Sequence, residues 1–193
     1  MIITNIGLPY SGKSEIGRRV AKKLGMHFVD VDDVLQERIG DLQKCVEEKG
    51  ERYFLDAERE VLMDLQIQEN TIYAPGGSFI HHPMALSKFR AQTDLVYFRI
   101  GFDEWVRRLD NSAHQRGIVG FQKGVRCVYD EMVPLLEFTA DVTISAKDFN
   151  LATKMYEDYI VRTKKLLEQE EQSCGGDWDI SNIIHELASH TFL

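Results

Sequence analysis

Residues 7–14 are Gly-Leu-Pro-Tyr-Ser-Gly-Lys-Ser, and they join a short β-branched, apolar run at residues 1–6 to a segment with helical spacing at residues 13–24. Glycines in such a turn let backbone N–H groups point inward at an anion, and the positive end of the following helix dipole adds to the attraction. A Gly-x4-Gly-Lys-Ser pattern between a strand and a helix is that of a P-loop. It predicts an α/β fold with a nucleoside triphosphate site.

The residue types of the loop also assign roles within that site. We expect Lys13 to reach the β- and γ-phosphates and Ser14 to ligate Mg²⁺. ATP and Mg²⁺ are therefore the predicted cofactors. The residues expected at the cofactor are Gly7, Tyr10, Ser11, Gly12, Lys13, Ser14 and Glu15, and those expected at the metal are Ser14 and Asp30.

The rest of the chain alternates short apolar strands with helical patterns, as a parallel sheet with helices on both faces requires. The predicted strands are residues 1–7, 27–29, 71–74, 95–100 and 142–144. The predicted helices are residues 13–24, 34–40, 41–49, 51–68, 83–89, 102–110, 124–137 and 149–170. We expect one kinase-like domain over residues 1–172 and a helical C-terminal extension over 173–193.

Asp30 and Asp32 follow the second predicted strand, at the edge of the sheet where open α/β folds bind ligands. If the strand continues through both residues, their side chains share one side. One carboxylate would then lie near magnesium, and the other would accept a proton from a substrate hydroxyl. An equally good interpretation is structural, because Asp32 and Asp33 precede an apolar helix and could cap it.

Two Gly-rich segments complete the candidate site. The turn at residues 75–78 places Gly76 and Gly77 after the third strand, where glycine permits close approach of a ligand. The polar loop at residues 111–124 carries Arg116, which could close over ATP and stabilise the transferring charge.

Composition excludes several classes of function. The formal net charge of −8 and the sequence pI near 5.3 give no electrostatic footprint for nucleic acid. No apolar run approaches the length of a membrane span, and the N-terminus lacks the features of a signal peptide. Three widely spaced cysteines favour reduced thiols, so we expect a cytoplasmic protein. The expected partner is a small hydroxylated acceptor. The protein is expected to be a monomer or a weak homodimer.

The order and spacing of these segments resemble the shikimate kinase family over about residues 1–163. The P-loop is specific only to the superfamily, and further segments carry the resemblance. They are Phe28-Val29-Asp30-Val31-Asp32, Gly50 to Glu58, Ala74-Pro75-Gly76-Gly77-Ser78, Gln115-Arg116-Gly117-Ile118-Val119, Tyr129 to Leu136 and Ala140 to Ile144.

The resemblance implies a three-layer P-loop kinase fold, with five parallel strands in the order 2-3-1-4-5. It also implies that Asp32 holds and activates the acceptor hydroxyl, that Asp30 lies near magnesium, and that Arg116 is the lid arginine. Lys13, Asp32 and Arg116 are the expected catalytic residues of a phosphotransferase with an alcohol group as acceptor. The expected substrate-binding positions are Asp32, Leu55, Gly76, Gly77 and Met132.

Three positions depart from the family, and all lie on the acceptor side. Leu55 and Met132 stand where the family has arginines that grip the shikimate carboxylate, and Pro75 replaces the first glycine of a triplet. Each lost charge-assisted hydrogen bond removes about 1.5–3 kcal/mol. Two of them correspond to about 10²–10⁴-fold weaker carboxylate binding. The candidate replacements are Arg52, Arg59 and Arg126, although a bidentate grip needs specific geometry.

The leading interpretation is thus an ATP-dependent kinase of a small alcohol, with an acceptor that differs from shikimate. Alternatives are an authentic shikimate kinase with a rearranged carboxylate site, a nucleotide or sugar-acid kinase, and a nucleotide-binding regulator without kinase activity. The two replaced arginines favour the regulator, whereas the retained Lys13, Asp32 and Arg116 oppose it.

Overall fold

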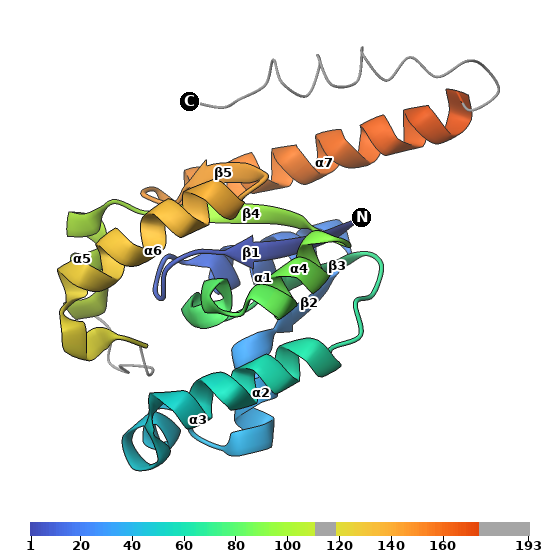
Figure 1. The fold of residues 1–193 in the computed structure, drawn as a ribbon. Coiled ribbons are helices and arrows are strands. Elements are labelled where there is room, and N and C mark those ends of the chain that lie inside the picture. The colour runs from blue at the N-terminus through green and yellow to red at the C-terminus, as the bar shows by residue number, and fades with distance from the viewer. Residues whose placement is uncertain (111–118, 174–193) are drawn as a thin grey trace.

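The structure, a computed structural model, describes residues 1–110 and 119–173 (Figure 1). In that part of the chain a parallel sheet has five strands in the order β2-β3-β1-β4-β5, as predicted. The strands are β1 (Ile2–Ile6), β2 (His27–Asp30), β3 (Thr71–Ala74), β4 (Asp94–Arg99) and β5 (Val142–Ser145). The order changes direction next to β1, so the loop that follows β1 lies at the crevice where such sheets bind ligands.

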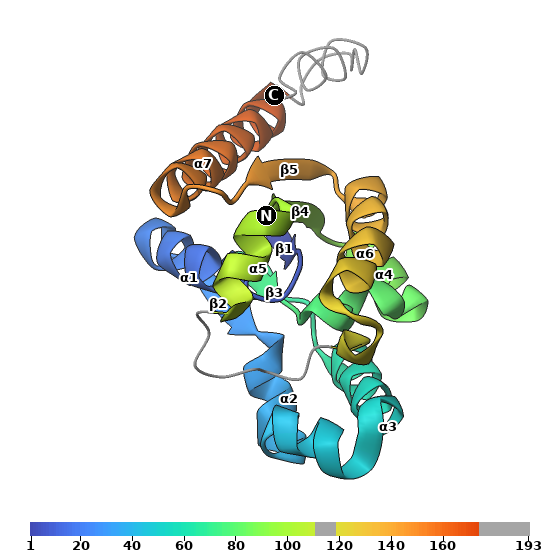
Figure 2. The ribbon, with the colours of Figure 1, turned by 90° about the vertical axis from the view of Figure 1, so that its left-hand side faces the viewer.

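Helices cover both faces of the sheet, which confirms the three-layer architecture. In Figure 2, α1 and α7 lie on one side of the strands, and α4 and α6 lie on the other. The helices are α1 (Lys13–Leu24), α2 (Val31–Ile39), α3 (Leu42–Asp64), α4 (Pro83–Arg90), α5 (Phe102–Asp110), α6 (Val125–Thr139) and α7 (Phe149–Ser173). Two short 3-10 helices, η1 (Gly77–His81) and η2 (Phe121–Lys123), were not expected from the sequence.

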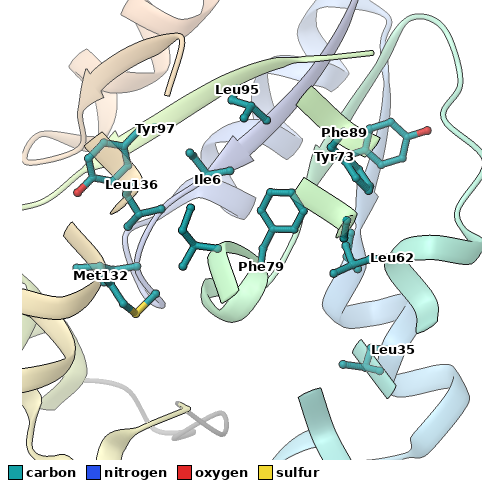
Figure 3. Packing of buried hydrophobic residues seen from close by; sticks show 14 of the residues in the cluster. Ile6, Leu35, Leu62, Tyr73, Phe79, Phe89, Leu95, Tyr97, Met132 and Leu136 are labelled. Atoms are coloured by element: carbon teal, nitrogen blue, oxygen red, sulfur yellow. The ribbon is translucent and has the colours of Figure 1, made fainter. Parts of the chain in front are cut away.

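Strand alternation divides the core into two clusters. On β4, Val96 and Phe98 pack in the cluster that contains residues of α1 and α7. Their neighbours Leu95 and Tyr97 join the opposite cluster, to which α3, α4 and α6 contribute (Figure 3). Because consecutive strand residues point to opposite faces, one apolar run serves both layers.

The second strand ends one residue later than predicted, but it does not continue through Asp32. β2 stops at Asp30 and α2 begins at Val31, so the expectation that a continuing strand places Asp30 and Asp32 on the same side is wrong. The Asp30 side chain accepts a hydrogen bond from the Asp32 N–H at 3.2 Å, which makes Asp30 the helix cap. A short carboxylate that bonds the backbone two residues ahead favours a helix start over a further strand residue.

The long helix α3 is interrupted where the sequence predicted a break. Gly50 has φ 84° and ψ 162° inside it, so the segment consists of two helical pieces joined at that glycine. No helix among the described residues is long and apolar enough to cross a membrane. The helix expected in residues 173–193 lies, from residue 174 onward, outside the described residues.

Candidate active site

The loop after β1 has the geometry of a phosphate cradle. Gly12 has φ 94° and caps α1 without a side-chain bond, so the first turn of that helix presents its backbone N–H groups to the site. The Ser11 hydroxyl is buried and has no hydrogen-bond partner among the described residues. A buried donor of this kind fits a phosphate oxygen, since unpaired buried polar groups are rare without a ligand.

Buried hydrogen bonds fix the cradle to the sheet. Asn5 Nδ2 donates to the carbonyl of Lys13 at 3.2 Å, and the Tyr156 hydroxyl donates to Asn5 Oδ1 at 2.6 Å. On the other side of the loop, Trp105 Nε1 donates to the carbonyl of Pro9 at 2.8 Å. Because partners from β1, α5 and α7 hold the loop, its shape is set before any ligand arrives.

Arg108 is a site residue that sequence reasoning missed. Its guanidinium donates to the carbonyl of Ser11 at 2.9 Å and to that of Ala146, after β5, at 2.6 Å. Glu104, one turn earlier, holds Arg108 Nε at 2.8 Å. Hydrogen bonds from Arg107 and Arg108 lower the pKa of Glu104 to about 2, so it remains a carboxylate at neutral pH. The only feature of the sequence that could have drawn attention to Arg108 was its i,i+4 spacing from Glu104.

Two predicted cofactor residues have environments that the motif alone did not show. Tyr10 has φ 61°, a left-handed conformation that few residues other than glycine adopt, and packs against the core. The Glu15 side chain is exposed and its carboxylate lies 2.9 Å from Arg19 Nε along the surface of α1. Only the backbone of Glu15 is therefore directed by the helix start towards the cradle.

Asp30 and Asp32 are close together but make different contacts. Asp30 is buried, and its Oδ2 lies 3.4 Å from Arg18 Nη2 in addition to the capping bond to Asp32. Asp32 lies in the first turn of α2, and its Oδ1 approaches the turn after β3 so closely that a Cβ atom on Gly76 would be 2.8 Å from it. The structure thus brings together Asp32 and Gly76, both predicted to contact the acceptor.

A buried hydrogen-bonded cluster around Glu58 supports this turn. Glu58 of α3 is 1% exposed and accepts from the Ser78 hydroxyl at 2.7 Å through Oε1. Its Oε2 lies 2.7 Å from His82 Nε2, and His82 is also buried. The Cβ position of Gly76 would be 2.9 Å from Glu58 Oε1. Glu58 follows Leu55 by one helical turn. This spacing in the sequence could have indicated that Glu58 lies on the same side of the helix as Leu55.

A cavity of about 210 Å³ lies beside the cluster and contains two more predicted acceptor residues, Leu55 and Met132. It is smaller than the roughly 300–1,000 Å³ typical of pockets for larger ligands. Its lining consists of Glu51, Leu55, His81, Val119, Gly120, Lys123, Val128, Glu131 and Met132. The set joins α3, η1 and α6 with the end of the segment between α5 and α6.

No arginine is found among the described residues that line this cavity. Arg59 is paired with Asp56 at 3.0 Å on the outer surface of α3. Arg126 is paired with Asp130 at 2.8 Å and stacks over a ring of α5. Arg52 is exposed. None of the three arginines considered as replacements therefore lines this cavity, where it could bind a carboxylate.

The structure places the two predicted halves of the site next to each other. Gly77 lies against Pro9 of the cradle, so the turn after β3 adjoins the phosphate loop. Arg116 lies outside the described residues. No group of three His, Cys, Asp or Glu suited to a metal occurs in the described part of the chain.

Comparison with known proteins gives consistent matches. A family model described as shikimate kinase matches residues 9–163. The shikimate kinase of Aquifex aeolicus is 35% identical over 113 residues, which cover 58% of this chain and 67% of that protein. That of Mycobacterium avium is 31% identical over 148 residues, 75% of this chain and 84% of that protein. Matches to two further curated relatives span 58% and 61% of those proteins.

The fold agrees with solved structures as well. The crystal structure of shikimate kinase from Aquifex aeolicus superposes with a TM-score of 0.67 at 27% identity, and the match covers 91% of this chain and all of that one. The similarity therefore extends beyond the phosphate loop to the whole described domain.

Proposed function

Because the chain belongs to the shikimate kinase family, we propose that it transfers the γ-phosphoryl group of ATP to a hydroxyl of a small metabolite other than shikimate. The observation that carries the proposal is the cavity beside the Glu58 cluster, which has Leu55 and Met132 where the family resemblance calls for carboxylate-binding arginines. The sequence keeps the family's phosphate-loop motif on the donor side, whereas it departs from the family on the acceptor side.

The donor site holds the triphosphate through the start of α1. Backbone N–H groups after Gly12 and the buried Ser11 hydroxyl are positioned to donate to phosphate oxygens. The Lys13 side chain is buried in the same loop, and its positive charge would neutralise the charge that develops on the transferred group. Ser14 and Asp30 would hold Mg²⁺, which would supply positive charge to offset that of the phosphates.

Asp32 acts on the acceptor. Its carboxylate, beside Gly76, accepts the proton of the acceptor hydroxyl while that oxygen attacks the γ-phosphorus. An O–P bond forms to the acceptor, and the bond from the γ-phosphorus to the bridging oxygen of ADP breaks. Asp32 later returns the proton to water. Glu58 and Ser78 hold the turn that carries Gly76, which keeps the acceptor oxygen in line.

The cavity supports a small acceptor rather than a nucleotide or a carboxylate-bearing ring. Its volume of about 210 Å³ lies below the roughly 300–1,000 Å³ typical of pockets for larger ligands, which favours a small acceptor over a nucleoside monophosphate. Leu55 and Met132 stand where the family resemblance calls for arginines that bind a carboxylate. Because two charge-assisted hydrogen bonds are lost, the affinity for a carboxylate should fall by about 10²–10⁴-fold.

The test is ATP-dependent phosphorylation of a panel of small polyols, followed by ³¹P NMR so that phosphorylated product is distinguished from ATP hydrolysis. We expect a phosphate ester with at least one member of the panel and a kcat/KM for shikimate that is at least 10²-fold lower. Efficient turnover of shikimate at micromolar concentrations would contradict the proposed acceptor. Tight ATP binding without any phosphate ester would instead indicate a nucleotide-binding regulator.

A further inference from the structure

The acceptor cavity carries a charge pattern that limits what it binds. Its described lining contains two carboxylates, Glu51 and Glu131, and one lysine, Lys123. Lys123 Nζ lies 3.3 and 3.4 Å from the two carboxylate oxygens of Glu131. The lysine charge is therefore directed at a neighbouring side chain, and Glu51 is left as the uncompensated charge of this lining.

Glu51 is fixed at the cavity rather than free to turn away. It is the first residue after the break at Gly50, where the second piece of α3 begins. Its Oε1 accepts a hydrogen bond from the backbone N–H of Gly120 at 2.9 Å, across the cavity from α3. This bond uses one carboxylate oxygen and orients the group, as a preorganised binding residue requires.

His81 does not offset the negative charge. It lines the cavity beside the buried His82, and burial, together with the charge of His82, lowers the pKa of its imidazole. At neutral pH the ring is uncharged. The remaining lining is apolar, formed by Leu55, Val119, Val128 and Met132.

These contacts describe a small compartment with an apolar wall and a fixed carboxylate. A ligand carboxylate placed there would face Glu51 at short range with no described arginine to compensate, whereas a hydrogen-bond donor would be attracted. Resting on the kinase activity proposed above, we propose that the acceptor is a small polyol whose substituent facing Glu51 is an ammonium or hydroxyl group and not a carboxylate.

The experiment uses three compounds that share their ring hydroxyls and differ at one substituent. They are shikimate and its analogues in which the carboxylate is replaced by a hydroxymethyl or an aminomethyl group. Measured kcat/KM with saturating ATP should be at least tenfold higher for each analogue than for shikimate. Equal or better turnover of shikimate overturns this inference and leaves the kinase activity standing.

Glu51→Gln provides the side-chain test, because an amide oxygen can still accept from Gly120 while the charge is gone. We expect it to reduce the preference for the aminomethyl compound over shikimate at least fivefold. The matched control is Glu47→Gln, which changes an exposed glutamate in the helical piece of α3 that precedes Gly50 and should leave the preference unchanged. An unchanged preference in Glu51→Gln overturns the role of that carboxylate.

Calorimetric binding with a non-hydrolysable ATP analogue separates the two proposals. If no compound of this set or of the polyol panel is phosphorylated but both analogues bind at least tenfold more tightly than shikimate, the kinase proposal fails and the ligand class stands. If none is phosphorylated and no such binding preference exists, both fail.

Discussion

Pro9 of the phosphate loop packs directly against the backbone of Gly77, so that a Cβ atom on Gly77 would lie 2.6 Å from Pro9 Cδ. The two residues belong to opposite sides of the proposed reaction, the donor loop after β1 and the acceptor turn after β3. Their contact leaves no room for a side chain. The spacing between the two halves of the site therefore depends on a glycine at this position.

Gly77→Ala should disturb both halves together. Overpacking of this kind costs about 1–3 kcal/mol, and a domain of this size loses about 2–4 °C in Tm per kcal/mol. We expect a lower Tm and at least a tenfold loss of kcat/KM. Gly101→Ala is the matched control, since a Cβ there meets nothing within 4 Å. Equal behaviour of the two variants in calorimetry and activity assays would show that the contact is not tight.

Glu58→Ala should destabilise the protein strongly. It removes the partner of both Ser78 and His82 and leaves two buried polar groups unpaired. Leaving a buried donor or acceptor without its partner costs about 1–3 kcal/mol for each group. Urea unfolding measures this loss, and Glu60→Ala, on the exposed face of the same helix, should stay within about 0.5 kcal/mol of the parent protein. A loss below about 1 kcal/mol in Glu58→Ala would mean that the cluster is hydrated.

Arg108→Lys should weaken ATP use more than it weakens the fold. A lysine cannot span the carbonyls of Ser11 and Ala146 as the planar guanidinium does. We expect the KM for ATP to rise at least tenfold with a change in Tm of only a few degrees. Arg107→Lys alters the exposed neighbour and should leave the KM for ATP within twofold. An unchanged KM in Arg108→Lys contradicts the assigned role.

Asp94→Asn should raise stability at neutral pH. Burial raises the pKa of the Asp94 carboxyl above its ordinary value of 3.8. The native state therefore holds this proton more tightly than the unfolded chain, and stability falls as pH rises from 3.8 through the native pKa. The Asn side chain can still accept from Tyr159, which bonds Asp94 at 3.1 Å. The Tm difference between variant and parent should be positive at pH 7 and vanish near pH 3. A negative difference at pH 7 would contradict the sign.

The sequence predicted the local structure of the phosphate loop well, because local rules determine it. The motif from Gly7 to Ser14 specifies a turn, a glycine conformation and a helix start within a few residues, and the strand order follows from the pattern of the whole chain. The break at Gly50 was also visible, since glycine interrupts an otherwise helical pattern.

The acceptor side could be predicted only in part, because contacts between distant segments create it. Nothing local places Glu51 against Gly120, or Glu58 against His82. The role of Arg108 could not be predicted for the same reason, since its partners lie 97 and 38 residues away in the sequence. The expectation that Asp32 or Asp33 caps the helix was wrong, because Asp30 is the cap, and the functional interpretation of Asp30 and Asp32 stays a prediction. Positions 55 and 132 were identified by resemblance, and the structure brings them into one cavity.

The most direct test of the proposed phosphoryl transfer compares two neighbouring carboxylates, Asp32 and Asp33. Asp32 approaches Gly76, whereas Asp33 is exposed and lies 3.6 Å from Arg18. With the best acceptor and saturating ATP, Asp32→Asn should lower the kcat for phosphate-ester formation by about 10²–10⁴-fold, with ATP affinity retained, and Asp33→Asn should stay within threefold of the parent. If Asp32→Asn forms the phosphate ester at the parental rate, Asp32 is not the catalytic base and the assigned mechanism is wrong.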